Sequence, residues 1–395
     1  MKRILKRSYK GVYTIYKSKL DINQAIQDCV SAGALTQEYF LPRKIQATWN
    51  VYLSERNRAK TTTWLIVGIA AYNRYKTVTH YLRTSRAMIA ESKILTIYDT
   101  IKSCGYISVL TCGAWNDIVY KRTKRSWYLC TRVGEEITKI DDNPCTRVMD
   151  VDECDEYKSG YACPDADLVI YDEFQNDSQR RGDFLRLNNL LSTLFRSRTG
   201  CKIILLSNTI DKGHEYFDEL ELRDFISCSD AGDNTLIKTA KGTTIYCELL
   251  DKRQNTENKA IIQEYYGFRT KGIEAITGEG WQVEDVPHIN PDIKYRTLAN
   301  NIYIYTRGLY IMLEPVLFAD GTTAIYAHKA NEPKEHADTY IYTHDVECGN
   351  SKHHYHMGSG NKLDRWIRNK LETRQVWYSN NDIGIKVARY IADRD

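Results

Sequence analysis

The feature of this sequence that most constrains its fold is a short apolar run that stops abruptly at two acids. Leu168–Tyr171 is apolar and β-prone, and Asp172 and Glu173 follow it directly. Such a run predicts a buried parallel strand, because parallel strands are covered on both faces. Open α/β sheets bind their ligands at the carboxyl ends of the strands. We therefore expect the two carboxylates to reach a functional site.

A second apolar run, Ile203–Leu206, repeats this pattern and ends at the polar pair Ser207 and Asn208. Between the two runs, apolar side chains recur at the spacing of one helix face. These side chains are Phe184, Leu187, Leu191 and Leu194. The segment therefore predicts a strand, a helix and a second strand, and each strand ends in side chains that can carry chemistry.

Upstream, a strand-like stretch, Ile45–Leu53, leads into the loop Ser54–Thr61, and a helical stretch follows. The phosphate-binding loop of P-loop proteins has the pattern G-x-x-x-x-G-K-[ST] between a strand and a helix. Here the spacing, the context and the final Lys-Thr pair are kept, but Ser54 and Ala59 replace the two glycines. Because glycine lets backbone N–H groups curl round phosphates, Ala59 must accept a conformation that glycine adopts more easily.

A second match to this pattern, Ala70–Thr77, lies inside the helical stretch with a bulky tyrosine before its lysine, and we reject it. Taken alone, Ser54–Thr61 also fits an ordinary basic loop, and an Asp-Glu pair also fits an acidic turn before a helix. Together they predict a nucleotide site, in which Asp172 holds hydrated Mg²⁺ and Glu173 orients or deprotonates the attacking water.

The bulk composition limits the function. The 395 residues suffice for two domains or one large one, and 42% hydrophobic residues allow a sizeable core. A net charge of +4 permits a local nucleic-acid groove without requiring one. The 11 cysteines include no C-x-x-C, which favours reduced thiols in a cytosol. The apolar run Trp64–Ala71 is too short to span a bilayer, and the basic start Met1–Lys10 lacks the apolar segment of a secretory signal.

Two further segments are candidates for phosphate contacts. Val78–Arg86 predicts a strand with Arg83 and Arg86 at its end, where they reach either a phosphate or solvent. Residues 115–132 predict a hairpin in which basic residues are interleaved with aromatic ones, a pattern that suits nucleic acid or a plain charged tip. Its basic residues are Lys121, Arg122, Lys124 and Arg125.

The remaining segments carry weaker signals. We expect Glu135–Asp155 to be an acidic loop and residues 209–290 to be irregular. From Asn301 onward the pattern predicts a separate α+β domain. Cys348 and its neighbouring histidines fit no standard zinc spacing, and no ordered carboxylate set for a two-metal nuclease is evident. The expected elements are strands at Ile302–Tyr305, Leu309–Leu313, Thr323–Tyr326 and Thr339–Tyr342, and helices near Lys362–Glu372 and Asp382–Ala392.

The order of these motifs resembles the DNA-packaging ATPases, or encapsidation proteins, of the small phi-29-like phages. The resemblance covers roughly residues 45–395 with gaps, and it is most specific over Lys158–Asn208. Besides the phosphate-binding loop, it rests on Tyr81–Arg86, Glu156–Pro164, Leu168–Phe174, Leu190–Arg198 and Leu205–Asn208.

The resemblance implies an α/β fold. A P-loop ATPase domain of the ASCE type, with a mostly parallel sheet, is followed by a smaller α+β, ribonuclease-H-like domain that binds nucleic acid but is not a nuclease. Mapped onto this chain, the parts are an N-terminal extension at 1–44, the ATPase domain at 45–250, a linker subdomain at 251–290 and the C-terminal domain at 291–395.

The resemblance also assigns roles to residues. Glu173 resembles the catalytic glutamate and Arg196 the arginine finger, while Thr61 and Asp172 correspond to the residues that hold Mg²⁺. The implied nucleotide-binding set is Ser54, Arg56, Asn57, Arg58, Ala59, Lys60, Thr61, Thr62, Arg83, Arg86, Lys158 and Asn208. Nucleic-acid contacts are expected at Lys121, Arg122, Lys124 and Arg125, and on the C-terminal helix at Lys362 and Arg365, with Arg368 and Lys370 nearby.

ATP and Mg²⁺ are the implied cofactors. The implied partners are double-stranded DNA, the prohead portal protein, a prohead RNA and further copies of the chain in a ring, expected to be a pentamer, with no membrane involved. The protein is expected in the host cytoplasm, docked transiently on the prohead and absent from the mature virion. The alternatives are a nucleotide-binding ring protein that does not hydrolyse ATP, and a terminase with an active C-terminal nuclease. Glu173 favours an enzyme, because binding alone needs the acid that holds the metal but not the acid that activates water.

Overall fold

The computed structural model divides the chain into two compact units, Met1–Gln282 and Val283–Asp395. The structure describes residues 3–8, 11–36, 41–54, 58–152, 154, 165–175, 182–196, 198–208, 214–229, 231–250, 287, 294–299, 302–306, 309–333, 339–343 and 362–392.

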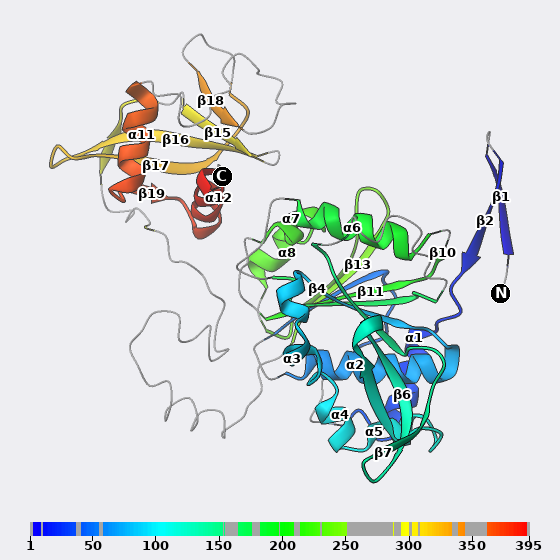
Figure 1. The fold of residues 1–395 in the computed structure, drawn as a ribbon. Helices are drawn as coiled ribbons and strands as arrows, with labels where there is room; N and C mark the ends of the chain where they lie inside the picture. Colours follow the sequence, from blue (N-terminus) through cyan, green and yellow to red (C-terminus); the bar gives the residue numbers. More distant parts are fainter. Residues whose placement is uncertain are drawn as a thin grey trace. The chain divides into compact units, whose positions relative to one another are not determined.

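The first unit is built on a large twisted sheet whose central strands are all parallel (Figure 1). The strand order is β12-β13-β3-β11-β9-β4-β8-β6-β5, with β7 beside β6. The parallel strands are β3 (Trp49–Ser54), β4 (Thr79–Arg83), β8 (Thr146–Asp150), β9 (Leu168–Asp172), β11 (Lys202–Asn208) and β13 (Thr244–Leu249). The antiparallel strands are β5 (Asp117–Lys121), β6 (Ser126–Val133), β7 (Glu136–Ile140) and β12 (Asn234–Lys238).

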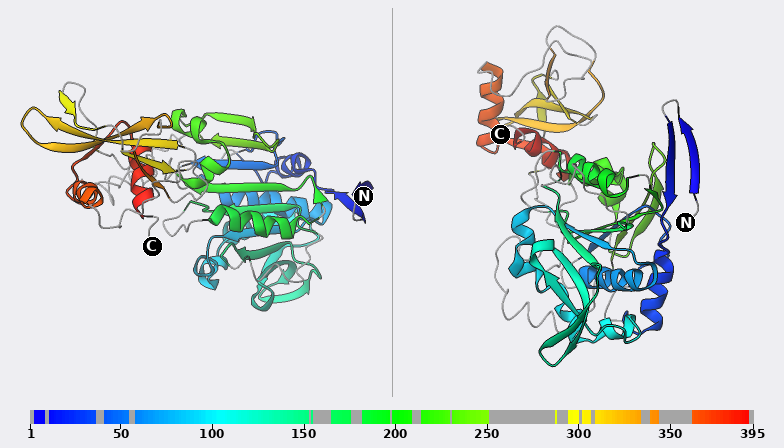
Figure 2. Two further views of the ribbon diagram at one scale, coloured as in Figure 1. Left: turned by 90° about the horizontal axis from the view of Figure 1, so that it is seen from above. Right: turned by 45° about the vertical axis from the view of Figure 1, so that its right-hand side comes forward.

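Helices cover both faces of this sheet (Figure 2). The core on one face contains α1 (Ile22–Ser31), α2 (Lys60–Tyr75), α3 (Glu91–Ile94), α4 (Asp99–Ser103) and α5 (Tyr106–Leu110), with the 3₁₀ helix η1 (Arg86–Ile89). The core on the other face contains α6 (Asp183–Leu194), α7 (Glu215–Glu219) and α8 (Arg223–Cys228). Since both faces are covered, the central strands are buried along most of their length, as is typical of parallel strands.

The segment 1–44, expected as an N-terminal extension, contributes to this unit in two ways. Helix α1 places Ile22, Ala25 and Ile26 in the same core as α2. Strand β2 (Gly11–Lys17) pairs with β1 (Arg3–Ser8) and with the short strand β10 (Arg198–Thr199), which forms a separate three-stranded sheet.

The prediction of an α/β fold with a mostly parallel sheet is confirmed, and so is the strand–helix–strand segment β9, α6 and β11. Two predictions about connecting segments are wrong. Glu135–Asp155 contains β7 and β8 rather than a loop, and the region after Asn208 contains α7, α8, β12 and β13. Their sequences mix charged and apolar residues, so no period is visible, and pairing with the neighbouring strands β4, β6 and β3 decides the structure.

The second unit is a sheet of order β18-β15-β16-β17-β19, with β14 beside β16, and two helices. All four predicted strands and both predicted helices are confirmed. Its core joins Ile304, Ile311 and Leu313 of the sheet to Ile367 and Val387 of the helices. The resemblance to ribonuclease H stays a prediction. The elements are β14 (Tyr295–Thr297), β15 (Ile302–Thr306), β16 (Leu309–Phe318), β17 (Thr323–Ala330), β18 (Tyr340–Thr343), β19 (Val376–Tyr378), α11 (Lys362–Glu372) and α12 (Asn381–Ala392).

Within the described residues, no helix combines the length and the apolar character needed to cross a membrane.

Candidate nucleotide-binding site

Three neighbouring parallel strands end at the same edge of the large sheet. Strand β11 lies between β3 and β9, and its last residue, Asn208, is the register partner of Ser54. On its other side, Leu206 is the register partner of Asp172. Helix α2 begins six residues after Ser54, at Lys60, and so starts from the same edge. Residues far apart in the sequence therefore meet where parallel strands present their ligand-binding side chains.

A cavity of about 210 Å³ lies at this edge. The phosphate-binding loop and the Asp-Glu pair, which the sequence indicated separately, both line its wall. The lining residues are Arg58, Ala59, Lys60, Thr61, Thr62, Asp172, Glu173, Ser207 and Asn208. Ser54 lies beside the cavity, where it contacts Lys60. Arg56, Asn57 and Lys158 lie outside the described residues.

Lys60 is the buried cation of the site, with 7% of its surface exposed. Its ammonium group donates to the Ser54 hydroxyl at 2.6 Å, to the Ser54 carbonyl at 3.4 Å and to Asn208 Oδ1 at 3.2 Å. Neutral oxygens thus fix the ammonium at the cavity wall. A lysine ammonium placed in this way is a point charge suited to phosphate oxygens.

Ala59 has a left-handed backbone, with φ of 52° and ψ of 25°, immediately before the first residue of α2. This confirms that the position demands the conformation that glycine adopts easily. A non-glycine residue in this region costs about 1–2 kcal/mol, so the loop keeps the glycine-like path at some expense of stability.

The carboxylate of Asp172 accepts three hydrogen bonds from side chains of the first unit. Its Oδ2 accepts from the Thr61 hydroxyl at 2.9 Å, from the Tyr81 hydroxyl at 2.7 Å and from Arg83 Nη1 at 3.0 Å. Burial, and then the nearby Asp172 carboxylate, raise the pKa of Tyr81 well above its usual value. The tyrosine is therefore a hydrogen-bond donor at neutral pH.

Glu173 follows the end of β9 with a left-handed backbone, φ of 52°. Its Oε2 lies 2.9 Å from Arg83 Nη2, so one guanidinium contacts both acids of the pair. Arg83, expected to bind nucleotide, is absent from the cavity lining and instead braces the two carboxylates. Arg86 is exposed at the start of η1 and also lies outside the lining.

Thr61 and Asp172 are the residues that could hold a divalent cation. Their hydroxyl and carboxylate oxygens lie 2.9 Å apart at the cavity wall, next to Lys60. Hard oxygen ligands are what Mg²⁺ prefers, and Mg²⁺ typically uses one or two protein oxygens together with substrate phosphates and water. The donor set therefore fits Mg²⁺ bound together with a nucleotide.

Arg196 lies at the opposite edge of the sheet. It lines an open groove of about 620 Å³ together with Trp49 at the start of β3 and Ile203 near the start of β11. Arg198 differs from it, since its side chain is only 6% exposed and forms an ion pair with Asp167 at 3.0 Å. Arg196 therefore does not reach the nucleotide cavity of its own chain, and Arg198 has a structural role.

The predicted basic hairpin is confirmed as β5 and β6, joined by the 3₁₀ turn η2 (Arg122–Lys124). The Arg125 carbonyl accepts from the Val148 amide at 2.9 Å, which places this turn toward the carboxyl end of β8. The turn therefore lies at the same sheet edge as the nucleotide cavity. Lys121 Nζ lies 4.3 Å from the Tyr128 ring, and Arg125 Nη1 lies 3.8 Å from the buried Asp150.

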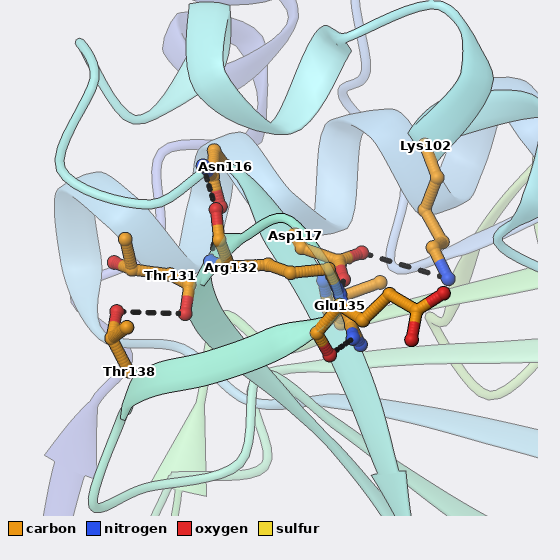
Figure 3. Close-up of polar contacts among 8 residues, drawn as sticks. Lys102, Asn116, Asp117, Thr131, Arg132, Glu135 and Thr138 are labelled. Atoms are coloured by element: carbon orange, nitrogen blue, oxygen red, sulfur yellow. Dashed lines mark hydrogen bonds and ion pairs between the residues drawn. The ribbon is translucent and has the colours of Figure 1, made fainter.

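The other end of this hairpin is fixed by polar contacts (Figure 3). Asp117 on β5 pairs with Arg132 on β6 and lies 3.5 Å from Lys102 on α4. The Asn116 side chain exchanges hydrogen bonds of 2.8 Å and 2.9 Å with the Arg132 backbone. These contacts hold β5 and β6 together, and β5 against α4, at the end of the hairpin away from its basic turn.

In the second unit, Lys362, Arg365 and Arg368 are exposed on α11. Lys370 is buried and donates to the Thr323 carbonyl and to Gln375, both at 2.6 Å, so it has a structural role instead of a nucleic-acid contact. Within the described ranges, no group of three or more His, Cys, Asp or Glu residues could hold a metal. Cys348 and its neighbouring histidines, which fit no standard zinc spacing, lie outside those ranges.

Comparison with solved structures supports this description of the fold. The sequence matches no protein-family model and no curated protein. The structure is similar to a chain of the Phi-28 gp11 DNA packaging motor, with a TM-score of 0.57 and 13% identity over 89% of this chain and 96% of that one. It is also similar to a chain of the bacteriophage Phi-29 viral genome packaging motor assembly, with a TM-score of 0.56 and 15% identity over 88% and 96%. The resemblance inferred from the motifs is thus confirmed at the level of the fold.

Proposed function

We propose that this chain is the ATPase subunit of a viral genome-packaging motor, which hydrolyses ATP to translocate double-stranded DNA into a prohead. The fold is similar to that of two packaging-motor chains over almost the whole length of each. A shared fold hosts many functions, so the proposal depends on the site. The observation that carries it is the single cavity shared by Lys60, Thr61, Asp172 and Glu173.

Each of these side chains has a role that its position supports. Lys60 neutralises the β- and γ-phosphates. Thr61 and Asp172 would hold Mg²⁺, which would offset the charge that develops on the transferring phosphoryl group. Glu173 lies at the same cavity wall and orients the attacking water. The left-handed backbone at Ala59 lets the loop approach the phosphates.

Hydrolysis is favoured over binding alone by the position of Glu173. Its side chain is 45% exposed and lines the cavity next to Asp172. A protein that only binds nucleotide has no use for a second acid at this place, whereas hydrolysis requires a group that positions water.

The chain acts as a homo-oligomeric ring, taken to be a pentamer, in which Arg196 completes the site of the neighbouring subunit. Its location at the sheet edge opposite the cavity supports a role in another subunit. The ring docks on the portal of the prohead through a prohead RNA in the host cytoplasm and leaves before the virion matures. The DNA is gripped through its phosphates, because a packaging motor must accept every sequence.

The test is the steady-state ATPase rate of the purified chain with Mg²⁺, measured with and without duplex DNA. We expect a measurable ATPase rate, and we expect this rate to differ between the samples with and without duplex DNA. Lys60→Ala should abolish nucleotide binding, whereas Glu173→Gln should bind ATP and hydrolyse it slowly. Undiminished turnover in both variants would sink the assignment of this cavity.

The two alternatives predict other results. If the chain forms a ring that does not hydrolyse ATP, the wild-type protein should bind nucleotide but show no turnover above the Glu173→Gln level. A terminase with an active nuclease would nick plasmid DNA in Mn²⁺. We expect no cleavage by the C-terminal unit, since Glu314 and Asp320 there are engaged with His328 and Thr322.

A further inference from the structure

Tyr81 lies outside the cavity lining yet contacts the central acid of the site. It occupies the middle of β4, next to β9, and its register partner is Ile170. The ring is 2% exposed within the core on the α2 face of the sheet. From this buried position its hydroxyl donates to Asp172 Oδ2 at 2.7 Å.

The hydrogen bonds around Asp172 are one-sided. The three donors, Thr61, Tyr81 and Arg83, all bond Oδ2. Among the described residues, no hydrogen bond reaches Oδ1, although Asp172 lines the cavity. Because a carboxylate is planar, fixing one oxygen from the protein side restricts the direction in which the other oxygen points.

The three donors are not equivalent. Thr61 lines the cavity itself and is a candidate ligand in its own right. Arg83 divides its guanidinium between Asp172 and Glu173 at the end of a long side chain. Tyr81 makes its hydroxyl contact from a ring that close packing holds in one place, so it is the donor whose position depends least on what enters the cavity.

We propose that Tyr81 is a positioning residue, which holds the Asp172 carboxylate in the orientation needed to bind a divalent cation together with a nucleotide. This inference rests on the proposed function. Hydrogen-bond partners behind a metal ligand orient it and increase its basicity, and their loss typically lowers metal affinity by about 10- to 100-fold. In the sequence Tyr81 looks like an ordinary core tyrosine, and its contact with Asp172 gives it a function at the site.

The simpler interpretation is that a buried tyrosine needs an acceptor and Asp172 happens to supply one. The two interpretations predict different results for Tyr81→Phe. A structural role changes only the stability of the fold. A positioning role changes the metal dependence of nucleotide binding while leaving nucleotide binding without metal intact.

The experiment is a fluorescence titration of a labelled ADP, first in EDTA and then over a range of Mg²⁺ concentrations. For Tyr81→Phe we expect the same affinity as wild type in EDTA, and a half-maximal Mg²⁺ effect at a concentration about 10- to 100-fold higher. Mn²⁺ binding followed by electron paramagnetic resonance in the presence of ADP should weaken by a similar factor.

Tyr171→Phe is the matched control. Tyr171 lies on the adjacent strand β9, is 1% exposed, and bonds Thr84 at 3.0 Å within the core on the opposite face. Tyr171→Phe also removes one buried hydroxyl, but this hydroxyl bonds Thr84 and not the Asp172 carboxylate, so the Mg²⁺ dependence of the variant should equal that of wild type. An unchanged Mg²⁺ dependence in Tyr81→Phe, or an equal shift in both variants, overturns the positioning role alone. If the wild-type protein shows no Mg²⁺-dependent binding of ADP, the proposed function falls and this inference with it.

Discussion

Arg83 and Glu173 form an ion pair whose Nη2 and Oε2 atoms lie 2.9 Å apart, at the carboxyl ends of the neighbouring strands β4 and β9. The same guanidinium also contacts Asp172 at 3.0 Å. Only 13% of the Arg83 side chain and 8% of the Asp172 side chain are exposed. One cation therefore neutralises the two acids that the proposed chemistry needs, and its removal leaves a buried carboxylate without its charge partner.

We predict that Arg83→Ala lowers the free energy of unfolding of the nucleotide-free protein by about 3 kcal/mol at neutral pH, because breaking a buried pair strands one charge. Asp172→Asn should remove much of this penalty, so the double variant should be more stable than additivity predicts by at least about 1 kcal/mol. Urea unfolding of the four proteins measures the coupling.

Arg86→Ala is the control for this cycle. Arg86 is an exposed arginine three residues further along, and its removal should change the stability by no more than about 0.5 kcal/mol. Strict additivity of Arg83→Ala and Asp172→Asn would show that the contact contributes nothing.

The sequence predicts this edge of the sheet well for a physical reason. The apolar runs before Asp172 and Asn208 predict parallel strands, and the carboxyl ends of such strands must meet. Lys60 lies in the loop between a predicted strand and a predicted helix, so the sequence places it at the same edge of the sheet. The sequence alone therefore predicts that Lys60, Asp172 and Asn208 lie together, without any knowledge of tertiary contacts.

The missed features depend on pairing between distant segments. Tyr81 lies in the predicted strand Val78–Arg86 and looks like a core residue. Only the register of β4 against β9 brings its hydroxyl to Asp172. Strand β8 contains the charged residues Arg147 and Asp150, which interrupt its apolar pattern. Strand β13 pairs in parallel with β3, which lies almost 200 residues earlier in the chain. No local period signals such pairings.

We predict that His80 makes the folded state sensitive to acid. It is fully buried on β4, and its Nδ1 lies 3.2 Å from the Val78 carbonyl oxygen. Burial, followed by the positive charge of Arg147, lowers the pKa of His80 to about 3. In the unfolded chain the pKa of His80 has the ordinary value of about 6.5. Between these two pKa values the unfolded state therefore binds a proton at His80 and the folded state does not.

The contribution of His80 to stability is therefore complete above pH 6.5 and declines as the pH falls toward 3. The slope for one such group is at most about 1.4 kcal/mol per pH unit. We predict that His80→Leu flattens the decline in unfolding free energy between about pH 6 and pH 4 by up to about 3 kcal/mol. Urea midpoints of the variant and wild type across this range provide the measurement, and parallel curves would contradict it.

The turn between β5 and β6 should bind DNA through phosphates. Lys124 is exposed in this turn, at the same sheet edge as the nucleotide cavity. We predict that Lys124→Ala weakens binding to every duplex sequence alike. The slope of log affinity against log salt should become shallower by about 0.9, the value for one lost phosphate contact.

Lys241→Ala is the matched control for this prediction. Lys241 is an exposed lysine in the turn between β12 and β13, near the start of β13 and so at the opposite edge of the sheet. Its removal changes the net charge equally but should leave the salt slope unchanged. Equal effects of the two variants would mean that only overall charge matters, and a sequence-dependent effect of Lys124→Ala would mean that the turn reads bases.

Two arginines near the end of α6 should behave in opposite ways. Arg198 is buried and contacts Asp167 and the carbonyls of Ala166 and Leu194. Arg198→Ala should therefore destabilise the fold by about 3–5 kcal/mol. Arg196 is exposed at the groove, so Arg196→Ala should leave the unfolding free energy within about 0.5 kcal/mol of wild type. Thermal or urea unfolding separates the two, and a strongly destabilised Arg196→Ala would show a structural role for Arg196 as well.

The remaining prediction is that Arg196 acts on the site of a neighbouring subunit. It lies at the sheet edge opposite its own cavity, while Glu173 lies inside that cavity. A guanidinium is always charged and binds phosphate oxygens in pairs, so it can stabilise the charge on a transferring phosphoryl group. Loss of such a finger lowers the rate by about 10³ or more, roughly 4 kcal/mol.

Mixing experiments test this arrangement. Arg196→Ala and Glu173→Gln proteins should each be nearly inactive alone. Mixed in one ring, they should regain part of the ATPase rate, because some interfaces then join an intact Glu173 to an intact Arg196 from the next subunit. A mixture of Lys60→Ala and Glu173→Gln should regain nothing, since both changes damage the site of their own chain and no neighbour can supply the missing group. If the first mixture stays as inactive as the second while mixed rings form, Arg196 does not complete a neighbour's site.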